Sequence, residues 1–206
     1  MLRVYFCLAE GDAPAFPDGL LSAYRKEKLA LQKNPSVRSR SLFSELLLRY
    51  ALRDCGFAPD APLEITVGEY GKPRLTGGEL CFNLSHSADA LLCAVSDRRL
   101  GADVQRIGAA PDALMERFFA EEERAYVLSS ETADEAFTEI WTKKESWCKL
   151  SGKGLALPLP SFSVLDAQIA PLLWHRRAGD YHVCVCCEAV REGQIEWYEV
   201  KTKELP

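Results

Sequence analysis

The chain has 206 residues, of which 48% are hydrophobic, and carries a formal net charge of −5. This length allows a buried core, arranged as one domain or as two small lobes. No apolar run approaches the roughly 18 to 20 residues that a membrane span needs, and no basic and then apolar leader opens the chain. We therefore expect a cytoplasmic protein with no membrane partner.

The predicted elements form two successive blocks of strands and helices, with a seam near residues 97–101. They are, in chain order, a strand at 2–8, helices at 18–31 and 36–54, strands at 63–69 and 80–84, a hairpin of 90–95 with 100–106, helices at 112–128 with a break near Ala120 and at 134–150, and strands at 161–166, 171–176, 181–190 and 195–200.

The first block contains a basic zone on an otherwise acidic chain. Residues 25–53 carry eight basic side chains against two acidic ones. A compact zone of this kind favours a small polyanion over nucleic acid, whose long phosphate array usually needs a broader basic face. Part of the zone is the solvated face of the helix at 36–54, and Arg38 and Arg40 lie in its first turns.

Cysteine and histidine give no metal or redox signature. The eight cysteines, in a chain without a secretory signal, predict reduced thiols. Cys184 and Cys187 form a C-x-x-C, but they lie in a predicted strand, where positions three apart face opposite sides of the sheet. His175 and His182 match no motif, and we interpret them as structural.

The helix at 134–150 places charges beside its apolar stripe. The stripe is formed by Phe137, Ile140, Trp141 and Cys148. At 100° per residue, Glu145 and Lys149 fall together on the flank of this stripe, where a charge needs a partner. An ordinary surface ion pair would explain these two residues taken alone. Lys144 falls at the centre of the stripe, and the sequence offers no account of it.

A third acidic position lies upstream, in the strand at 100–106. Asp103 and Gln105 alternate with apolar residues and therefore share one face of the strand. Together with Glu145 they would form a half-shell of oxygen ligands suited to Mg²⁺, which takes its other ligands from water and substrate phosphate. The alternative is that Asp103 and Gln105 simply face solvent.

Five short blocks, in order, resemble the 4′-phosphopantetheinyl transferases of the Sfp (surfactin-synthetase activating) type. They are Tyr70-Gly71-Lys72-Pro73, Phe82-Asn83-Leu84-Ser85-His86-Ser87, Gly101-Ala102-Asp103-Val104-Gln105, Trp141-Thr142-Lys143-Lys144-Glu145-Ser146 with Lys149, and Gly152-Lys153-Gly154-Leu155. The resemblance implies Mg²⁺-dependent transfer of phosphopantetheine from coenzyme A to a serine of an acyl or peptidyl carrier protein, in fatty-acid, polyketide or nonribosomal-peptide synthesis. Adenosine 3′,5′-bisphosphate would be released.

The resemblance also implies a fold, an assembly and a domain division. It implies an α+β fold of two similar lobes related by a pseudo-twofold axis, which agrees with the two predicted blocks. Residues 1–99 would form the lobe for the nucleotide end of coenzyme A, and residues 100–206 the lobe for the metal and the carrier protein. A chain that builds the whole site itself is expected to be a monomer.

The site residues are carried over position by position. Asp103 and Glu145 would hold the metal, with Gln105 bound directly or through water; the family commonly has Glu at that position. Lys149 would reach the phosphates, and Glu145, or a metal-bound water that it holds, would accept the serine proton. Coenzyme A would be held by a further set: Arg25, Lys28, Arg40, Lys72, Ser85 and His86. We expect Ser85-His86-Ser87 to form a turn after a strand, and Lys72 to point outward from a turn.

Two other functions stay open at this level. A binding module for coenzyme A or a carrier protein would explain the Gln105 departure, whereas a metal-dependent nucleotide hydrolase lacks an extra carboxylate or histidine near the motif. For carrier docking, the seven acidic side chains in 116–135 form a poor surface for an acidic partner. We expect docking at Trp147 and at the loop 151–157 with Lys153 instead.

Overall fold

The computed structural model describes residues 1–13, 16, 18–57, 61–188 and 193–206. The strands are β1 (Leu2–Leu8), β2 (Ile65–Val67), β3 (Pro73–Leu75), β4 (Cys81–Ser87), β5 (Ala90–Ser96), β6 (Leu100–Arg106), β7 (Leu173–Ala178), β8 (Tyr181–Cys187) and β9 (Ile195–Glu199). The α-helices are α1 (Ala23–Leu31), α2 (Pro35–Asp54), α3 (Asp112–Phe118), α4 (Glu121–Leu128) and α5 (Ala133–Ser151). Short 3₁₀ helices lie at Asp18–Leu20, Gly154–Ala156, Leu159–Ser161, Ala170–Leu172 and Thr202–Glu204.

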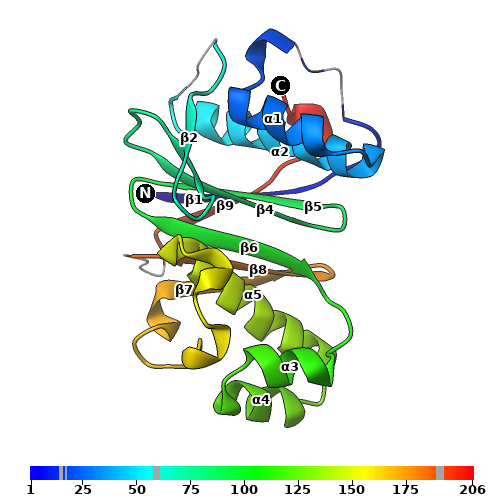
Figure 1. Ribbon diagram of the computed structural model, residues 1–206, viewed down its shortest axis with the longest axis vertical. Helices are drawn as coiled ribbons and strands as arrows, with labels where there is room; N and C mark the ends of the chain where they lie inside the picture. The colour runs from blue at the N-terminus through cyan, green and yellow to red at the C-terminus, as the bar shows by residue number, and fades with distance from the viewer. Residues whose placement is uncertain (14–15, 17, 58–60, 189–192) are drawn as a thin grey trace.

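Two sheets form the centre of this mixed α+β fold. The first has the order β4-β5-β1-β9, the second has the order β6-β8-β7, and β2 and β3 form a separate small hairpin. The sheets face each other, with α2 on the outer side of the first and α5 on the outer side of the second (Figure 1). The apolar core between the sheets comes from β1 and β5 on one side and from β6 and β8 on the other.

The helices begin and end where local chemistry requires. The side chain of Ser22 accepts a hydrogen bond from the backbone N–H of Arg25 and so caps α1. Asn34 caps α2 in the same way, and Pro35 occupies the first helical position, where its missing N–H costs nothing. Gly152 ends α5 with φ of +74°, in the left-handed region that glycine adopts without strain. This end of α5 carries the residues predicted to be functional.

Gly101 allows α5 to lie directly on β6. A Cβ at this position would come 2.0 Å from the carbonyl oxygen of Ser146 and 2.3 Å from the backbone nitrogen of Leu150. No side-chain motion could relieve a clash with backbone atoms. The glycine therefore sets the distance between the strand that carries Asp103 and the helix that carries Glu145.

Side chains of β4 bridge the two sheets along the outer edge of β6. The side-chain oxygens of Asn83, Ser85 and Ser87 accept hydrogen bonds from the backbone N–H groups of Ala102, Val104 and Arg106, at 2.7, 3.4 and 3.1 Å respectively. The spacing of two residues on both strands makes this a regular ladder. It occupies N–H groups that a sheet edge would otherwise leave unpaired, and it fixes the register between the two sheets.

Two predicted elements are wrong. Residues 90–95 and 100–106 do form strands, but not a hairpin: β5 pairs with β1 and β4, whereas β6 pairs with β8. Both strands are largely buried, and the connection at the seam crosses between facing sheets instead of continuing one sheet. The strand expected at 161–166 is absent; a 3₁₀ helix at Leu159–Ser161 and turns lie there, and the next strand begins at Leu173.

The expected turn at Ser85-His86-Ser87 is also wrong. These residues continue β4, and the chain reverses after them at Ala88, whose φ is +50°. Alternation along the strand sends Ser85 toward β6 and His86 to the opposite face. The break near Ala120 is confirmed, because α3 and α4 are separate helices. Residues 189 and 190 of the predicted strand at 181–190 lie outside the described residues.

The last strand returns to the first sheet. β9 pairs in parallel with β1, although it lies within the segment 100–206 that the predicted division gives to the second lobe. All eight cysteines are free, and Cys184 and Cys187 lie in β8. No helix in the described part of the chain is long and apolar enough to cross a membrane.

Candidate functional site

Asp103 lies at the centre of the predicted site and is 2% exposed. Its Oδ1 accepts hydrogen bonds from Lys149 Nζ and from Ser85 Oγ, both at 2.6 Å, and its Oδ2 accepts one from Gln105 Nε2 at 3.0 Å. Ser85 also accepts a hydrogen bond from Lys149 at 2.9 Å. Residues from β4, β6 and α5 therefore converge on one carboxylate. From the sequence, these residues could only be assigned to three separate elements.

Glu145 faces this cluster from α5. Partial burial raises the pKa of its carboxyl, the negative charge of Asp103 raises it further, and Lys149 acts in the opposite direction. Within the described residues, its carboxylate has no hydrogen-bond or ion-pair partner, whereas Lys149 pairs with Asp103. The ordinary ion pair of Glu145 with Lys149, which would have explained these residues taken alone, does not form.

The donor set of Asp103, Glu145 and Gln105 fits a hard divalent cation. Two carboxylates lie close enough for one to raise the pKa of the other, and a cation between them would relieve that repulsion. The set has only two acidic members. In the described part of the chain, no three or more His, Cys, Asp or Glu side chains are arranged to hold a metal ion. Magnesium binding here would thus depend on the amide oxygen of Gln105, water or substrate.

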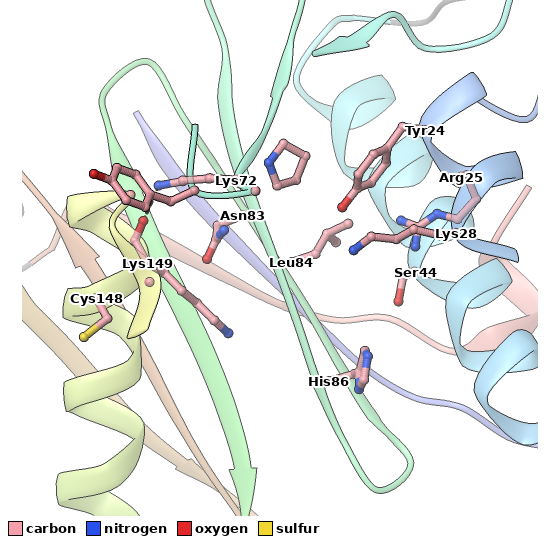
Figure 2. A pocket seen from close by; sticks show the side chains of 15 residues that line it. Tyr24, Arg25, Lys28, Ser44, Lys72, Asn83, Leu84, His86, Cys148 and Lys149 are labelled. Carbon is pink, nitrogen blue, oxygen red and sulfur yellow. Dashed lines mark hydrogen bonds between the residues drawn. The ribbon is translucent and has the colours of Figure 1, made fainter. Parts of the chain in front are cut away.

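A pocket of about 270 Å³ opens beside this cluster, between the first sheet with its helices and the end of α5 (Figure 2). Its lining includes the predicted residues Arg25, Lys28, Lys72, His86 and Lys149. The other lining residues are Tyr24, Ser44, Tyr70, Gly71, Pro73, Asn83, Leu84, Cys148, Gly152 and Gly154. All the charged side chains of this lining are cationic, which suits a phosphorylated ligand.

His86 and Arg40 lie on the side of the pocket formed by β4 and α2. The pKa of His86 is lowered, first by partial desolvation and then by the positive charges of Arg40 and Lys149. Arg40 is not part of the pocket lining, and its guanidinium donates a hydrogen bond to Ser36 Oγ at 3.2 Å. Its charge nevertheless acts on His86, where it favours the neutral form of the imidazole.

Arg25 and Lys28 both extend from α1, but they differ in burial and in ion pairing. The guanidinium of Arg25 is buried, paired with Glu45 at 3.1 Å and hydrogen-bonded to Ser41 at 3.0 Å. Lys28 is exposed and lies over the ring of Tyr24, 4.8 Å from its centroid. Because Glu45 neutralises Arg25, Lys28 offers the more available charge of the two.

Lys72 does not point outward as expected. Its Nζ donates hydrogen bonds to the carbonyl oxygens of Leu100 at 2.6 Å and Lys149 at 2.5 Å. Burial, together with Arg99 and Arg74, lowers its pKa to about 8. The lysine thus ties the β2–β3 hairpin to the end of α5 and the start of β6, while part of its side chain still lines the pocket.

The structure explains Lys144, for which the sequence had no account. Its fully buried Nζ pairs with Glu123 Oε2 at 2.6 Å and donates to the carbonyl oxygen of Phe162 at 2.8 Å. Glu123 also accepts hydrogen bonds from the backbone N–H groups of Ala120 and Val164. Lys144 therefore joins α5 to α4 and to the following loop, away from the pocket lining.

Sequence reasoning overlooked Asn83 as a site residue. It lies two positions before Ser85 on the same strand face, so the alternation of β4 would have pointed to it. Because a turn was expected after Leu84, the alternation of the strand was not followed beyond that residue. Tyr24, Tyr70 and Cys148 also line the pocket without having been singled out.

Comparisons with known proteins agree with the resemblance. Residues 99–196 match the profile of the 4′-phosphopantetheinyl transferase superfamily. The chain is 37% identical to 4′-phosphopantetheinyl transferase gsp of Aneurinibacillus migulanus over 137 residues. The matched segment covers 66% of this chain and 57% of that protein. It is 32% identical over 147 residues to a 4′-phosphopantetheinyl transferase of Bacillus subtilis, covering 70% of this chain and 66% of the relative. With 4′-phosphopantetheinyl transferase Sfp of B. subtilis strain 168 the identity is 29%, with the same coverage. The chain thus spans less than two thirds of the length of these relatives.

Proposed function

Because this chain belongs to the 4′-phosphopantetheinyl transferase superfamily, we propose that it transfers phosphopantetheine from coenzyme A to a serine of an acyl or peptidyl carrier protein. The observation that carries the proposal is the convergence of Asp103, Glu145 and Lys149 beside a cation-lined pocket. Such an arrangement suits phosphoryl-transfer chemistry, in which the protein chiefly positions groups and offsets charge.

In the proposed reaction, the carrier serine oxygen forms a bond to the β-phosphorus of coenzyme A. The bond from that phosphorus to the bridging oxygen of the diphosphate breaks, and adenosine 3′,5′-bisphosphate leaves with the electron pair. Glu145, or a metal-bound water that it would hold, accepts the serine proton. Gln105 cannot serve as that base, because its amide does not accept a proton.

The remaining residues bind and neutralise. Asp103 and Glu145, with Gln105, would hold Mg²⁺, which when bound supplies charge neutralisation at the diphosphate. Lys149 offers a second positive charge at the same place, since it already lies between Asp103 and the pocket. His86, Arg40 and Lys28 would bind the 3′-phosphate end, with Arg25 held in place by Glu45.

The architecture gives this proposal a second element. We propose that the two helix-on-sheet halves, α2 on the first sheet and α5 on the second, correspond to the lobes of a pseudo-twofold fold, divided near residue 99 except that β9 returns to the first sheet. The pocket lies between them, so a single chain would build the complete site and would act as a monomer.

A direct assay tests the function. The protein is incubated with coenzyme A, Mg²⁺ and an apo carrier protein, and the carrier is weighed by mass spectrometry. A gain of one phosphopantetheine on the carrier supports the transferase. An unmodified carrier with intact coenzyme A would instead indicate a binding module, and cleaved coenzyme A without carrier modification would indicate a hydrolase.

A further inference from the structure

Asn83 occupies an unusual place in the pocket. Its side chain is 5% exposed, lies on β4, and projects between Lys72 and Lys149 (Figure 2). It is one rung of the ladder that joins β4 to β6, because its Oδ1 accepts a hydrogen bond from the backbone N–H of Ala102 at 2.7 Å. It is also the only one of the three rungs, Asn83, Ser85 and Ser87, that lines the pocket.

The ladder fixes the orientation of the Asn83 amide. The N–H group of Ala102 can only donate, so it must meet the amide oxygen and not the amide nitrogen. The reversed orientation would set two donors against each other. The Nδ2 group is therefore turned away from Ala102, and it carries two N–H donors.

These donors have no acceptor within the part of the chain that the structure describes. No described residue accepts a hydrogen bond from Asn83 Nδ2, and the atom is not sealed off from solvent. A fixed, unpaired donor in a pocket wall is suited to an oxygen of a ligand. The neighbouring ammonium of Lys149 favours the part of the ligand that carries negative charge.

We propose that Asn83 is a substrate-binding residue whose Nδ2 donates to an acceptor oxygen near the diphosphate of coenzyme A. The inference rests on the proposed function, because that function supplies the ligand. The acceptor oxygen belongs either to the diphosphate or to the pantetheine chain, which carries amide carbonyls. In either case, one of the three side chains that join the two sheets would also contact the substrate.

The test compares variants that separate the two roles. Asn83→Ala removes both the ladder bond and the donors, whereas Ser87→Ala removes one ladder bond at Arg106 and lies outside the pocket lining. Asn83→Asp keeps an oxygen for the Ala102 N–H group and replaces the donors with an acceptor. Binding of coenzyme A to the metal-free protein is measured by calorimetry, and each variant is first checked for a cooperative thermal transition.

We expect Asn83→Ala and Asn83→Asp to weaken coenzyme A binding by about tenfold or more if the acceptor is the charged diphosphate, and by about threefold or more if it is a neutral pantetheine carbonyl. Ser87→Ala should bind as the unmodified protein does. Wild-type-like binding by either folded Asn83 variant, or an equal loss in Ser87→Ala, would overturn the inference. If the unmodified protein itself did not bind coenzyme A, the proposed function would fail as well.

A second ligand identifies the acceptor. Adenosine 3′-phosphate 5′-diphosphate has the nucleotide and the diphosphate of coenzyme A but no pantetheine. An equal loss of affinity for this compound and for coenzyme A assigns the contact to the diphosphate, and a loss for coenzyme A alone assigns it to a pantetheine carbonyl. Both results support Asn83 as a substrate-binding residue.

Discussion

The ammonium of Lys149 lies 2.6 Å from Oδ1 of Asp103, across the junction of α5 and β6. This pair, and not the alternative ion pair with Glu145 on the same helix, neutralises Lys149, and it leaves Glu145 as a partly buried carboxylate beside the negative charge of Asp103. The ionised form of Glu145 is thus destabilised in the free protein, and binding of a cation or a proton would relieve this cost.

Replacing Glu145 with Gln should stabilise the metal-free protein while abolishing transfer. Because the folded-state pKa of Glu145 is raised above its usual 4.5, its ionisation destabilises the fold once the pH exceeds that value. The gain in Tm should therefore be present at pH 7 and disappear as the pH falls below about 4. Thermal melts of both proteins across this range provide the measurement, and a lower Tm for Glu145→Gln at pH 7 would contradict it.

Asp103→Ala should also abolish transfer, and it serves as the comparison for position 105. Gln105→Glu should tighten Mg²⁺ binding, because a third negative charge joins those of Asp103 and Glu145 in the ligand set. The same change should lower the Tm of the metal-free protein, since the hydrogen bond from Gln105 to Asp103 becomes a repulsion. Gln105→Ala should lose only part of the rate. Mg²⁺ titration by calorimetry tests the first effect, and a complete loss of rate in Gln105→Ala would show a larger role for this residue.

Arg40→Ala and His86→Ala should each raise the KM for coenzyme A by about tenfold or more, because each removes a charged contact to phosphate. The effect should be much smaller with dephospho-coenzyme A, which lacks the 3′-phosphate. Steady-state kinetics with the two substrates make the comparison. Equal penalties on both would place these residues away from the 3′-phosphate.

Lys144→Met should destabilise the fold by about 3 to 5 kcal/mol, since it leaves the carboxylate of Glu123 buried without its partner. The double variant Lys144→Met with Glu123→Gln should recover part of this loss, because no buried charge remains. Urea denaturation gives both values. Equal stability of the single and double variants would mean that the ion pair has little energetic weight.

Lys153→Glu should raise the KM for the carrier protein and leave that for coenzyme A unchanged. Lys153 is exposed in the loop after α5, and Trp147 nearby is half-buried and packs toward Phe162, with ring centroids 6.4 Å apart. Because the acidic stretch 116–135 lies in the same half of the molecule, the salt dependence of carrier binding should be weak. A coenzyme A defect with a normal carrier KM would move Lys153 into the nucleotide site.

Much of this protein could be predicted from local patterns. Periodicity identified α2, the broken pair α3 and α4, and α5, because each depends on spacing within one segment. The resemblance pointed to the family through residues such as Asp103 and Glu145, whose chemistry follows from side-chain type. Alternation also placed Asp103 and Gln105 on one face, as their hydrogen bond confirms.

Only the tertiary structure decided which groups meet. The connection between β5 and β6 looks like a hairpin locally, but their apolar faces are buried between two sheets, and long-range pairing with β1 and β8 determines the outcome. Lys149 pairs with Asp103 and not with Glu145, and Lys144 pairs with Glu123. Lys72 donates to two backbone carbonyl oxygens. In each case a buried charge pairs with the group that the packing of the fold brings within reach. The amino-acid sequence determines which charged side chains lie beside apolar ones and therefore need partners. The packing of the folded chain determines which partners lie close enough to pair with them.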